Sequence, residues 1–157
     1  MAKKPPSNST PRIINRRAHH DYHFVEKLEV GIVLSGSEVK SVRNGQVSIG
    51  QGYARVETNG LYLYDVDIAL YPHAGPNQHN PKRRRKLLAH KHQIAHLADC
   101  TTSKGITLIP VAMYFVRGHA KLEVAVASGK RSYDKRQVIK KRETDREMRR
   151  AMTRKVI

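Results

Sequence analysis

The sequence contains five consecutive cations, Lys82-Arg83-Arg84-Arg85-Lys86, whose type and spacing suit the binding of phosphates. Neighbouring like charges are costly to hold together unless a polyanion neutralises them, and guanidinium groups bind phosphate oxygens in a planar, bidentate geometry. A second basic cluster, Asn15-Arg16-Arg17, is followed by His19, His20 and His23. The alternative for such runs is a solvated surface, but the charge of the whole chain favours binding to RNA or DNA.

The C-terminal stretch from Gly129 to Ile157 carries 12 Lys or Arg against 4 Asp or Glu, a net charge of +8 within the chain's +17. A segment this charged cannot bury enough apolar surface to fold alone. A narrow apolar stripe nevertheless recurs at helical spacing, at Met148, Ala151, Met152 and Val156. We expect this basic tail to be disordered when free and helical inside a phosphate-lined channel.

Metal binding and catalysis are weaker alternatives. Two histidine pairs have i, i+4 spacing, His19/His23 and His92/His96. The sequence has no His-Glu-x-x-His motif and no cysteine pair, so we predict no metal site and no cofactor. Asp65 and Asp67, in one predicted strand, could hold Mg²⁺ in a nuclease, although solvent-facing carboxylates are the commoner explanation. We therefore predict no enzymatic activity and no small-molecule substrate.

Composition also bounds the compartment. A single cysteine, Cys100, cannot form an internal disulfide. No apolar run approaches the roughly 18 residues of a membrane span, and no signal-peptide pattern begins the chain. The sequence therefore predicts a cytoplasmic protein with no membrane partner.

The hydrophobic residues concentrate between Phe24 and Ala127, where one small core is expected. Asn59-Gly60 supplies the backbone angles of a tight hairpin, and Pro110 inside a strand predicts an edge or a bulge. The predicted elements are a short helix or turn from Ile13 to Tyr22, a strand Phe24–Leu34, a short helix Ser37–Gly45, a hairpin of Tyr53–Glu57 and Leu61–Ile68, a helix Lys86–Asp99, and a hairpin of Ile106–Val116 and Lys121–Ala127.

These elements predict a mainly β fold with short helices, and an oligonucleotide-binding type closed β-barrel is the first choice, because such barrels bind nucleic acid on an open face and its loops. The expected organisation is a flexible leader over residues 1–12, the RNA-binding barrel over residues 13–132, and the basic tail over residues 133–157.

Several motifs occur in a specific order. They are Asn15-Arg16-Arg17-Ala18 with His20-Asp21-Tyr22, Glu29-x-Gly31-Ile32-x-Leu34-x-Gly36-x-Glu38-Val39-Lys40-Ser41, Arg85-Lys86-Leu87-Leu88, the Tyr114/Gly118/Lys121 hairpin, and Gly129-Lys130-Arg131-x-Tyr133-Asp134-Lys135-Arg136. In this order they resemble the SsrA-binding protein (SmpB) family over most of the chain. Two positions depart from the family pattern: Tyr133 replaces a common histidine, and Ser128 replaces a frequently basic residue.

The resemblance implies a barrel that binds the tRNA-like domain of transfer-messenger RNA (tmRNA) and delivers this RNA to ribosomes stalled on messages without a stop codon, in trans-translation. It also implies that the tail enters the empty messenger channel of the small ribosomal subunit, beyond the decoding centre, and folds there as a helix. A generic ribosomal or nucleoid protein, binding any RNA electrostatically, remains an alternative.

The resemblance implies that Asn15, Glu29 and Leu88 bind the RNA. A half-buried Glu29 is suited to accept hydrogen bonds from base edges or to orient a neighbouring Arg, and Leu88 to pack on unstacked bases or in the core. The predicted RNA contacts are Asn15, Arg16, Arg17, His20, Glu29, Lys40, Arg43, Arg83, Arg85, Lys86 and Leu88. The predicted junction with the tail, near the decoding centre, is Gly129, Lys130, Arg131, Tyr133, Asp134, Lys135 and Arg136.

Overall fold

The computed structural model describes the backbone of residues 11–154, and the side chains of these residues except 132–138, 142, 153 and 154. Its elements are β1 (Ile13–Ile14), α1 (Arg16–Asp21), β2 (Tyr22–Ile32), α2 (Gly36–Arg43), β3 (Val47–Ser48), β4 (Tyr53–Glu57), β5 (Gly60–Tyr64), β6 (Asp67–Ile68), β7 (Arg85–Leu88), α3 (Lys91–Thr102), β8 (Ile106–Val116), β9 (His119–Gly129) and α4 (Ser132–Arg154). The predicted fold class, mainly β with a few helices, is confirmed.

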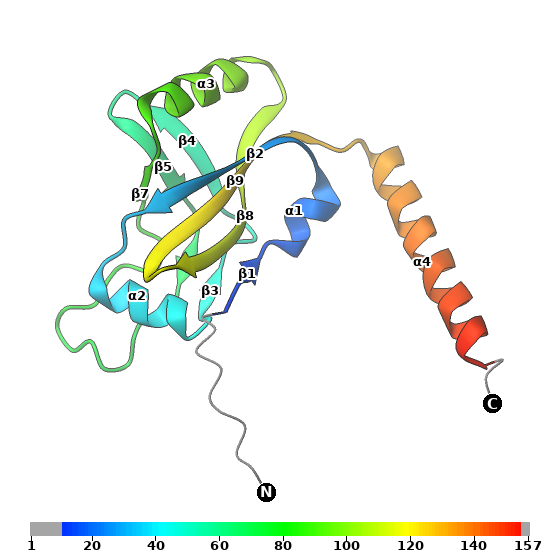
Figure 1. Ribbon diagram of the computed structural model, residues 1–157, viewed down its shortest axis with the longest axis horizontal. Coiled ribbons are helices and arrows are strands. Elements are labelled where there is room, and N and C mark those ends of the chain that lie inside the picture. Colours follow the sequence, from blue (N-terminus) through cyan, green and yellow to red (C-terminus); the bar gives the residue numbers. More distant parts are fainter. Residues whose placement is uncertain (1–10, 155–157) are drawn as a thin grey trace, which may run out of the picture.

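The main sheet closes into a ring. Its strand order is β1-β8-β4-β5-β7-β2-β9, and β8 also pairs with β9, which joins the two ends and leaves β1 at the edge of β8. All of these pairings are antiparallel. Helix α3 crosses one end of the ring, whereas α2 and the short strand β3 lie at the other end (Figure 1).

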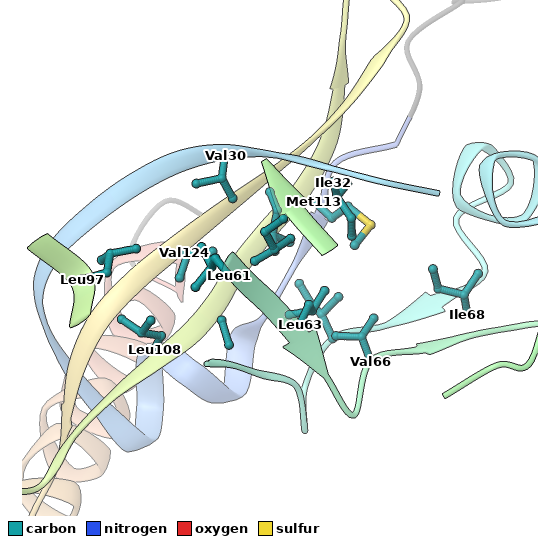
Figure 2. Packing of buried hydrophobic residues seen from close by; sticks show 14 of the residues in the cluster. Val30, Ile32, Leu61, Leu63, Val66, Ile68, Leu97, Leu108, Met113 and Val124 are labelled. Atoms are coloured by element: carbon teal, nitrogen blue, oxygen red, sulfur yellow. The ribbon is translucent and has the colours of Figure 1, made fainter. Parts of the chain in front are cut away.

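The core fills the inside of this ring because the strands alternate apolar and polar side chains with a period of two. In β5, Leu61 and Leu63 are fully buried, whereas Tyr62 and Tyr64 lie on the outer surface. Leu108 and Val124 come from β8 and β9 to the same cluster (Figure 2). The ring therefore has an apolar inside and an outer face on which polar and aromatic side chains are displayed.

The predicted helix from Lys86 to Asp99 is wrong at its start. Residues 85–88 form strand β7, in which Arg85 and Leu87 are buried while Lys86 and Leu88 are exposed. This strand fills the gap between β5 and β2, so ladder hydrogen bonds on both sides outweigh the helical spacing of the apolar residues. Helix α3 begins only at Lys91. His90 is its N-cap residue, and the His90 N–H donates a hydrogen bond to Gln93 Oε1 at 2.9 Å.

Three other local predictions can be compared with the structure. The hairpin is confirmed, but its loop is Thr58-Asn59, because Gly60 pairs with Glu57, and only Gly60 of the predicted turn has a positive φ, 131°. Pro110 lies at a bulge, where the register of β8 and β9 shifts between Pro110 and Ala112. The segment from Ile13 to Tyr22 is the short strand β1 followed by the short helix α1, which Asn15 caps.

The described part of the basic tail forms helix α4, which ends at Arg154. It projects away from the ring (Figure 1), and its described side chains are exposed, among them Ile139, Met148 and Met152. No glycine or proline interrupts the sequence after Gly129, and good helix formers dominate it, which favours this conformation locally. Residues 1–10 and 155–157 lie outside the described part of the chain, so the predicted leader remains a prediction.

Candidate nucleic-acid interface

Glu29, on the outer face of β2, is held by two side chains, one from the adjacent strand β9 and one from β8 beyond it. The Tyr114 hydroxyl of β8 donates a hydrogen bond to Glu29 Oε2, and Lys121 Nζ of β9 lies 3.4 Å from Glu29 Oε1. The hydrogen bond from Tyr114 is the largest cause of a lowered pKa for Glu29, and the same bond raises the pKa of Tyr114 to about 12. Glu29 is therefore an exposed, ionised acceptor in a fixed position.

Leu88 lies beside Glu29 and is not a core residue. Its side chain is 54% exposed, and it pairs with Gly31 of β2, where an added Cβ would lie 3.2 Å from Leu88 Cβ. A depression of about 310 Å³ surrounds it. We call this surface the Glu29 face; it is lined by Glu29, Gly31, Leu88, Ala89, His90, Gln93 and Lys121. An apolar side chain beside fixed polar groups suits an unstacked base of RNA.

Removing one hydroxyl tests whether the fixed position of Glu29 matters. We expect Tyr114→Phe to raise the pKa of Glu29 back toward its ordinary value, because its main stabilising hydrogen bond is lost. We also expect roughly 2- to 10-fold weaker binding of RNA, because one hydrogen bond that fixes Glu29 is lost. Carboxylate titration by NMR and an RNA binding assay measure the two effects. Tyr71→Phe, in a loop, is the matched control, and equal affinities for both variants would contradict the role.

The basic run of residues 82–86 splits between the outside and the inside of the protein. Arg84 and Lys86 are exposed, and the Arg84 guanidinium lies 5.2 Å from the centre of the Tyr62 ring. Arg85 is fully buried, and its guanidinium donates to Glu38 Oε1 at 2.8 Å and to the Val66 carbonyl at 2.7 Å. The prediction of Arg85 as an RNA contact is therefore wrong, because strand alternation turns it into the core.

Glu38 of α2 is the buried partner of this run. It accepts hydrogen bonds from Arg83 Nε, Arg85 Nε and the Ser35 N–H, at 2.8, 2.8 and 2.7 Å. Burial alone would raise the pKa of Glu38, but the hydrogen bonds from Arg83 and Ser35 and the charge of Arg85 outweigh it, so the pKa is lowered. Arg83 is half-exposed and pairs with Glu38. It therefore helps to hold the start of β7 against α2, and only part of its side chain is accessible to RNA.

Asn15 is also structural and not an exposed contact. It is 2% exposed, and its side chain donates to the carbonyls of Ile49 and Pro110 while accepting from the Ala18 N–H. The predicted RNA contact at Asn15 is therefore wrong, because every polar atom of the amide is used inside the protein. Its role is to fix the start of α1, on which Arg16 and Arg17 are exposed.

The junction with the tail is tied to α1. The Lys130 N–H donates to the Asp21 carbonyl at 2.9 Å, and Lys130 Nζ to the His19 carbonyl at 3.1 Å. These two hydrogen bonds of Lys130 join the junction to α1, in which His20 Nδ1 lies 2.9 Å from Asp21 Oδ1. Gly129 and Arg131 are exposed beside it. Tyr133, Asp134, Lys135 and Arg136 lie in the first turns of α4, and their side chains are outside the described residues.

The remaining predicted contacts, Lys40 and Arg43, are exposed on α2, and the Arg43 guanidinium lies 5.5 Å from the centre of the Phe115 ring. The structure thus does not gather all predicted residues on one surface: Glu29, Leu88 and Lys86 share the outer sheet, whereas Arg16, Arg17 and His20 lie on α1. The list of predicted contacts omitted Lys121, Tyr114 and Arg84, although the predicted basic run included Arg84. The hairpin motif contained the first two, but only the strand register shows that they meet Glu29.

The carboxylates of the nuclease alternative do not share a strand. Asp65 lies in the turn after β5, with φ 52°. Asp67 lies in β6 and pairs with Ser48 of β3. Among the residues that the structure describes, no group of three His, Cys, Asp or Glu side chains is placed to hold a metal ion. In the same residues, no helix is long and apolar enough to span a membrane.

Comparison with known proteins decides the family. The family model described as "SmpB protein" matches residues 12–154. The chain belongs to the SmpB family. It is 46% identical to the SsrA-binding protein of Latilactobacillus sakei over 97% of this chain and 98% of that protein, and 45% identical to that of Thermobifida fusca over 98% and 97%.

A solved structure agrees with this membership. A chain of the structure described as "tmRNA-SmpB: a journey to the center of the bacterial ribosome" has a TM-score of 0.67 and 44% identity, covering 78% of this chain and 86% of that chain. The likeness in sequence is therefore accompanied by a likeness in fold.

Proposed function

We propose that the protein is a non-enzymatic adaptor that binds the tRNA-like domain of tmRNA and delivers it to stalled ribosomes for trans-translation. Membership of the SmpB family and relatives named SsrA-binding proteins support this function. The observation that links this function to particular residues is the Glu29 face, where exposed Leu88 shares one depression with the ion pair of Glu29 and Lys121. As the ribosome is its partner, we place the protein in the cytoplasm.

The proposal also assigns the parts of the chain. We propose that the ring of strands, within residues 13–132, is an oligonucleotide-binding type barrel, supported by its small antiparallel closure and its polar outer face. Residues 133–157 form the tail, which enters the messenger channel of the small ribosomal subunit as a helix. In free protein we propose that this helix exchanges with disordered chain, because α4 packs little against the ring and bears many like charges.

The unit of α1 and the junction is proposed to face the decoding centre. Arg16, Arg17, Lys130 and Arg131 bring four cations together there, and the hydrogen bonds of Lys130 fix the direction in which α4 leaves the ring. Tyr133 occupies a position where a histidine is common in the family, so stacking by its ring, and not an imidazole charge, is the proposed contact.

Binding measurements across a salt series test the function. Neutralising roughly six phosphates costs on the order of 10³-fold in affinity between about 50 and 200 mM salt for any RNA. Specific contacts must therefore appear as a preference that persists at high salt. We expect at least a tenfold preference for the tRNA-like domain over a length-matched unrelated RNA, about 1.4 kcal/mol. Equal affinities at high salt would favour the generic electrostatic alternative.

The Glu29 face is tested by one substitution. We expect Leu88→Asp to weaken binding of the tRNA-like domain by about tenfold or more, because a carboxylate would replace the apolar contact and repel phosphates. Leu70→Asp is the matched control, since Leu70 is 50% exposed outside this face. The same loss of affinity in both variants would show that added negative charge, and not the site, causes the effect.

A further inference from the structure

A second group of RNA-compatible side chains lies on the outer surface of β4, β5 and β7. The strand register places Tyr53 opposite Tyr64, Arg55 opposite Tyr62, and Tyr62 opposite Lys86. We call this surface the tyrosine face; it consists of Tyr53, Arg55, Tyr62, Tyr64, Arg84 and Lys86. It adjoins the Glu29 face through β7, whose outward residues are Lys86 and Leu88, but it offers rings where the Glu29 face offers a carboxylate and a leucine.

The rings of this face are arranged in two stacks. Tyr53 and Tyr64 stack with centroids 5.4 Å apart and planes 15° apart. On the neighbouring rung, the Arg84 guanidinium covers the Tyr62 ring. Tyr53 is 39% exposed, and the Arg84 side chain is 63% exposed. Tyr53 and Arg84 are therefore accessible to solvent, and the two stacks are about 7 Å apart along the strands, because Tyr62 and Tyr64 are two residues apart in β5.

Glu57 holds the two stacks in place. It accepts a hydrogen bond from the Tyr64 hydroxyl, and its Oε2 lies 3.5 Å from Arg84 Nη1. The tyrosine face carries three cations, Arg55, Arg84 and Lys86, against the one carboxylate of Glu57, so its net charge is positive. The planar groups are oriented before any ligand binds, which lowers the entropy cost of binding.

From this geometry we infer that the tyrosine face binds unpaired RNA nucleotides, stacking one base on Tyr53 and one on the Arg84–Tyr62 pair while Arg55 and Lys86 contact phosphates. Unpaired bases expose the faces that a duplex hides, and stacking on aromatic or guanidinium planes is tolerant of sequence. Phosphates supply the negative charge that the cations require. This inference goes beyond the proposed function, because it concerns any unpaired segment and not the tRNA-like fold.

A short fluorescent RNA tests the inference directly. The probe is a ten-nucleotide RNA with 2-aminopurine near its centre, and the full-length chain is used. We expect binding to quench 2-aminopurine, which reports stacking. Tyr62→Leu keeps apolar bulk on the strand but removes the ring, and we expect it to weaken binding roughly tenfold and reduce the quenching. Tyr71→Leu, a tyrosine of a separate loop, is the matched control and should change neither.

Two further variants keep the test decisive if Tyr62→Leu is poorly folded. Arg84→Gln leaves every ring in place and should still reduce the quenching, because the planar cation over Tyr62 is lost. Lys86→Gln should lower the salt dependence of binding while the quenching persists. Quenching that is unchanged in both Tyr62→Leu and Arg84→Gln would overturn the inference, as would a probe that the protein does not bind.

Failure of this inference and failure of the proposed function are distinguishable. Leu88→Asp should lose affinity for the tRNA-like domain and keep the quenching of the short probe. Loss of both together would mean one undivided cationic surface and would overturn the tyrosine face as a separate site. Displacement of the bound probe by tmRNA or by small ribosomal subunits identifies which of them supplies the unpaired nucleotides, and displacement by neither would count against the inference.

Discussion

Ending the chain after Arg136 is expected to reduce tagging on stalled ribosomes to background while binding of the tRNA-like domain stays nearly intact. Helix α4 projects from the ring, so its removal takes no side chain from the core (Figure 1). The removed residues include many cations, which suit a phosphate-lined channel. Their exposed apolar side chains, Ile139, Met148 and Met152, are not part of the Glu29 face. The effect should therefore fall on the ribosomal step alone.

Tagged product from a message without a stop codon, and affinity for the tRNA-like domain, are measured on the same preparations. A full-length Met148→Ser, Met152→Ser variant is the matched control, because it keeps every charge and removes only the apolar stripe. Partial loss of tagging in this control would separate the apolar contribution from charge. If the shortened chain loses RNA binding as well as tagging, the tail is a main source of affinity and the division of labour proposed here is wrong.

Glu38→Ala is expected to destabilise the protein by roughly 3–5 kcal/mol, the effect of leaving a buried charge without its partner. Glu38 and Arg85 are both fully buried, and Arg83 also donates to Glu38. The loss should exceed that of an ordinary surface change because Arg85 cannot reach water without moving β7. A loss of this size is a large fraction of a typical domain's stability, so the variant will be close to unfolding.

Urea unfolding measures this prediction, and Glu26→Ala, which removes an exposed carboxylate, is the control expected to change stability by less than about 0.5 kcal/mol. If Glu38→Ala costs no more than this control, the ion pair does not hold β7. A double replacement, Glu38→Leu with Arg85→Met, should recover much of the loss, because apolar residues of similar volume often replace a buried ion pair without cost.

The same group gives the protein a defined acid sensitivity. The pKa of Glu38 is lower in the folded protein than its ordinary value of 4.5. Its contribution to the free energy of unfolding is therefore complete above pH 4.5 and is lost as the pH falls through the lowered pKa. Because β7 carries Lys86 and Leu88, loss of this anchor in acid should disturb both the Glu29 face and the tyrosine face.

Much of the local structure could be predicted from the sequence. Asn59-Gly60 and Pro110 require particular backbone conformations, so the first hairpin and the bulge follow from local chemistry. Residues 85–88 show where this fails: apolar spacing alone suits a helix, and only the unfilled edges of β5 and β2 make the segment a strand. The tail was expected to lack structure when free, yet its own residues favour the helix α4.

The candidate site was predicted less completely than the fold. Glu29, Leu88 and the predicted cations of α1 and α2 are accessible, so they remain candidate contacts, whereas Asn15 and Arg85 are buried and structural. Both carry side chains that RNA-binding surfaces use, and composition cannot distinguish an outward amide or guanidinium from an inward one. The partners of Glu29 lie 85 and 92 positions away in the sequence, so only strand pairing brings them together.

By itself, the sequence determined the class of partner and the family, because net charge and motif order are properties of the chain and need no coordinates. Only the tertiary structure decided which cations can reach RNA. In a strand, successive side chains point to opposite faces, so β7 sends Arg85 to a buried carboxylate and its neighbour Lys86 to solvent. The pairing of β7 with β5 places Tyr62 beside Lys86, and its pairing with β2 places Leu88 beside the strand that carries Glu29.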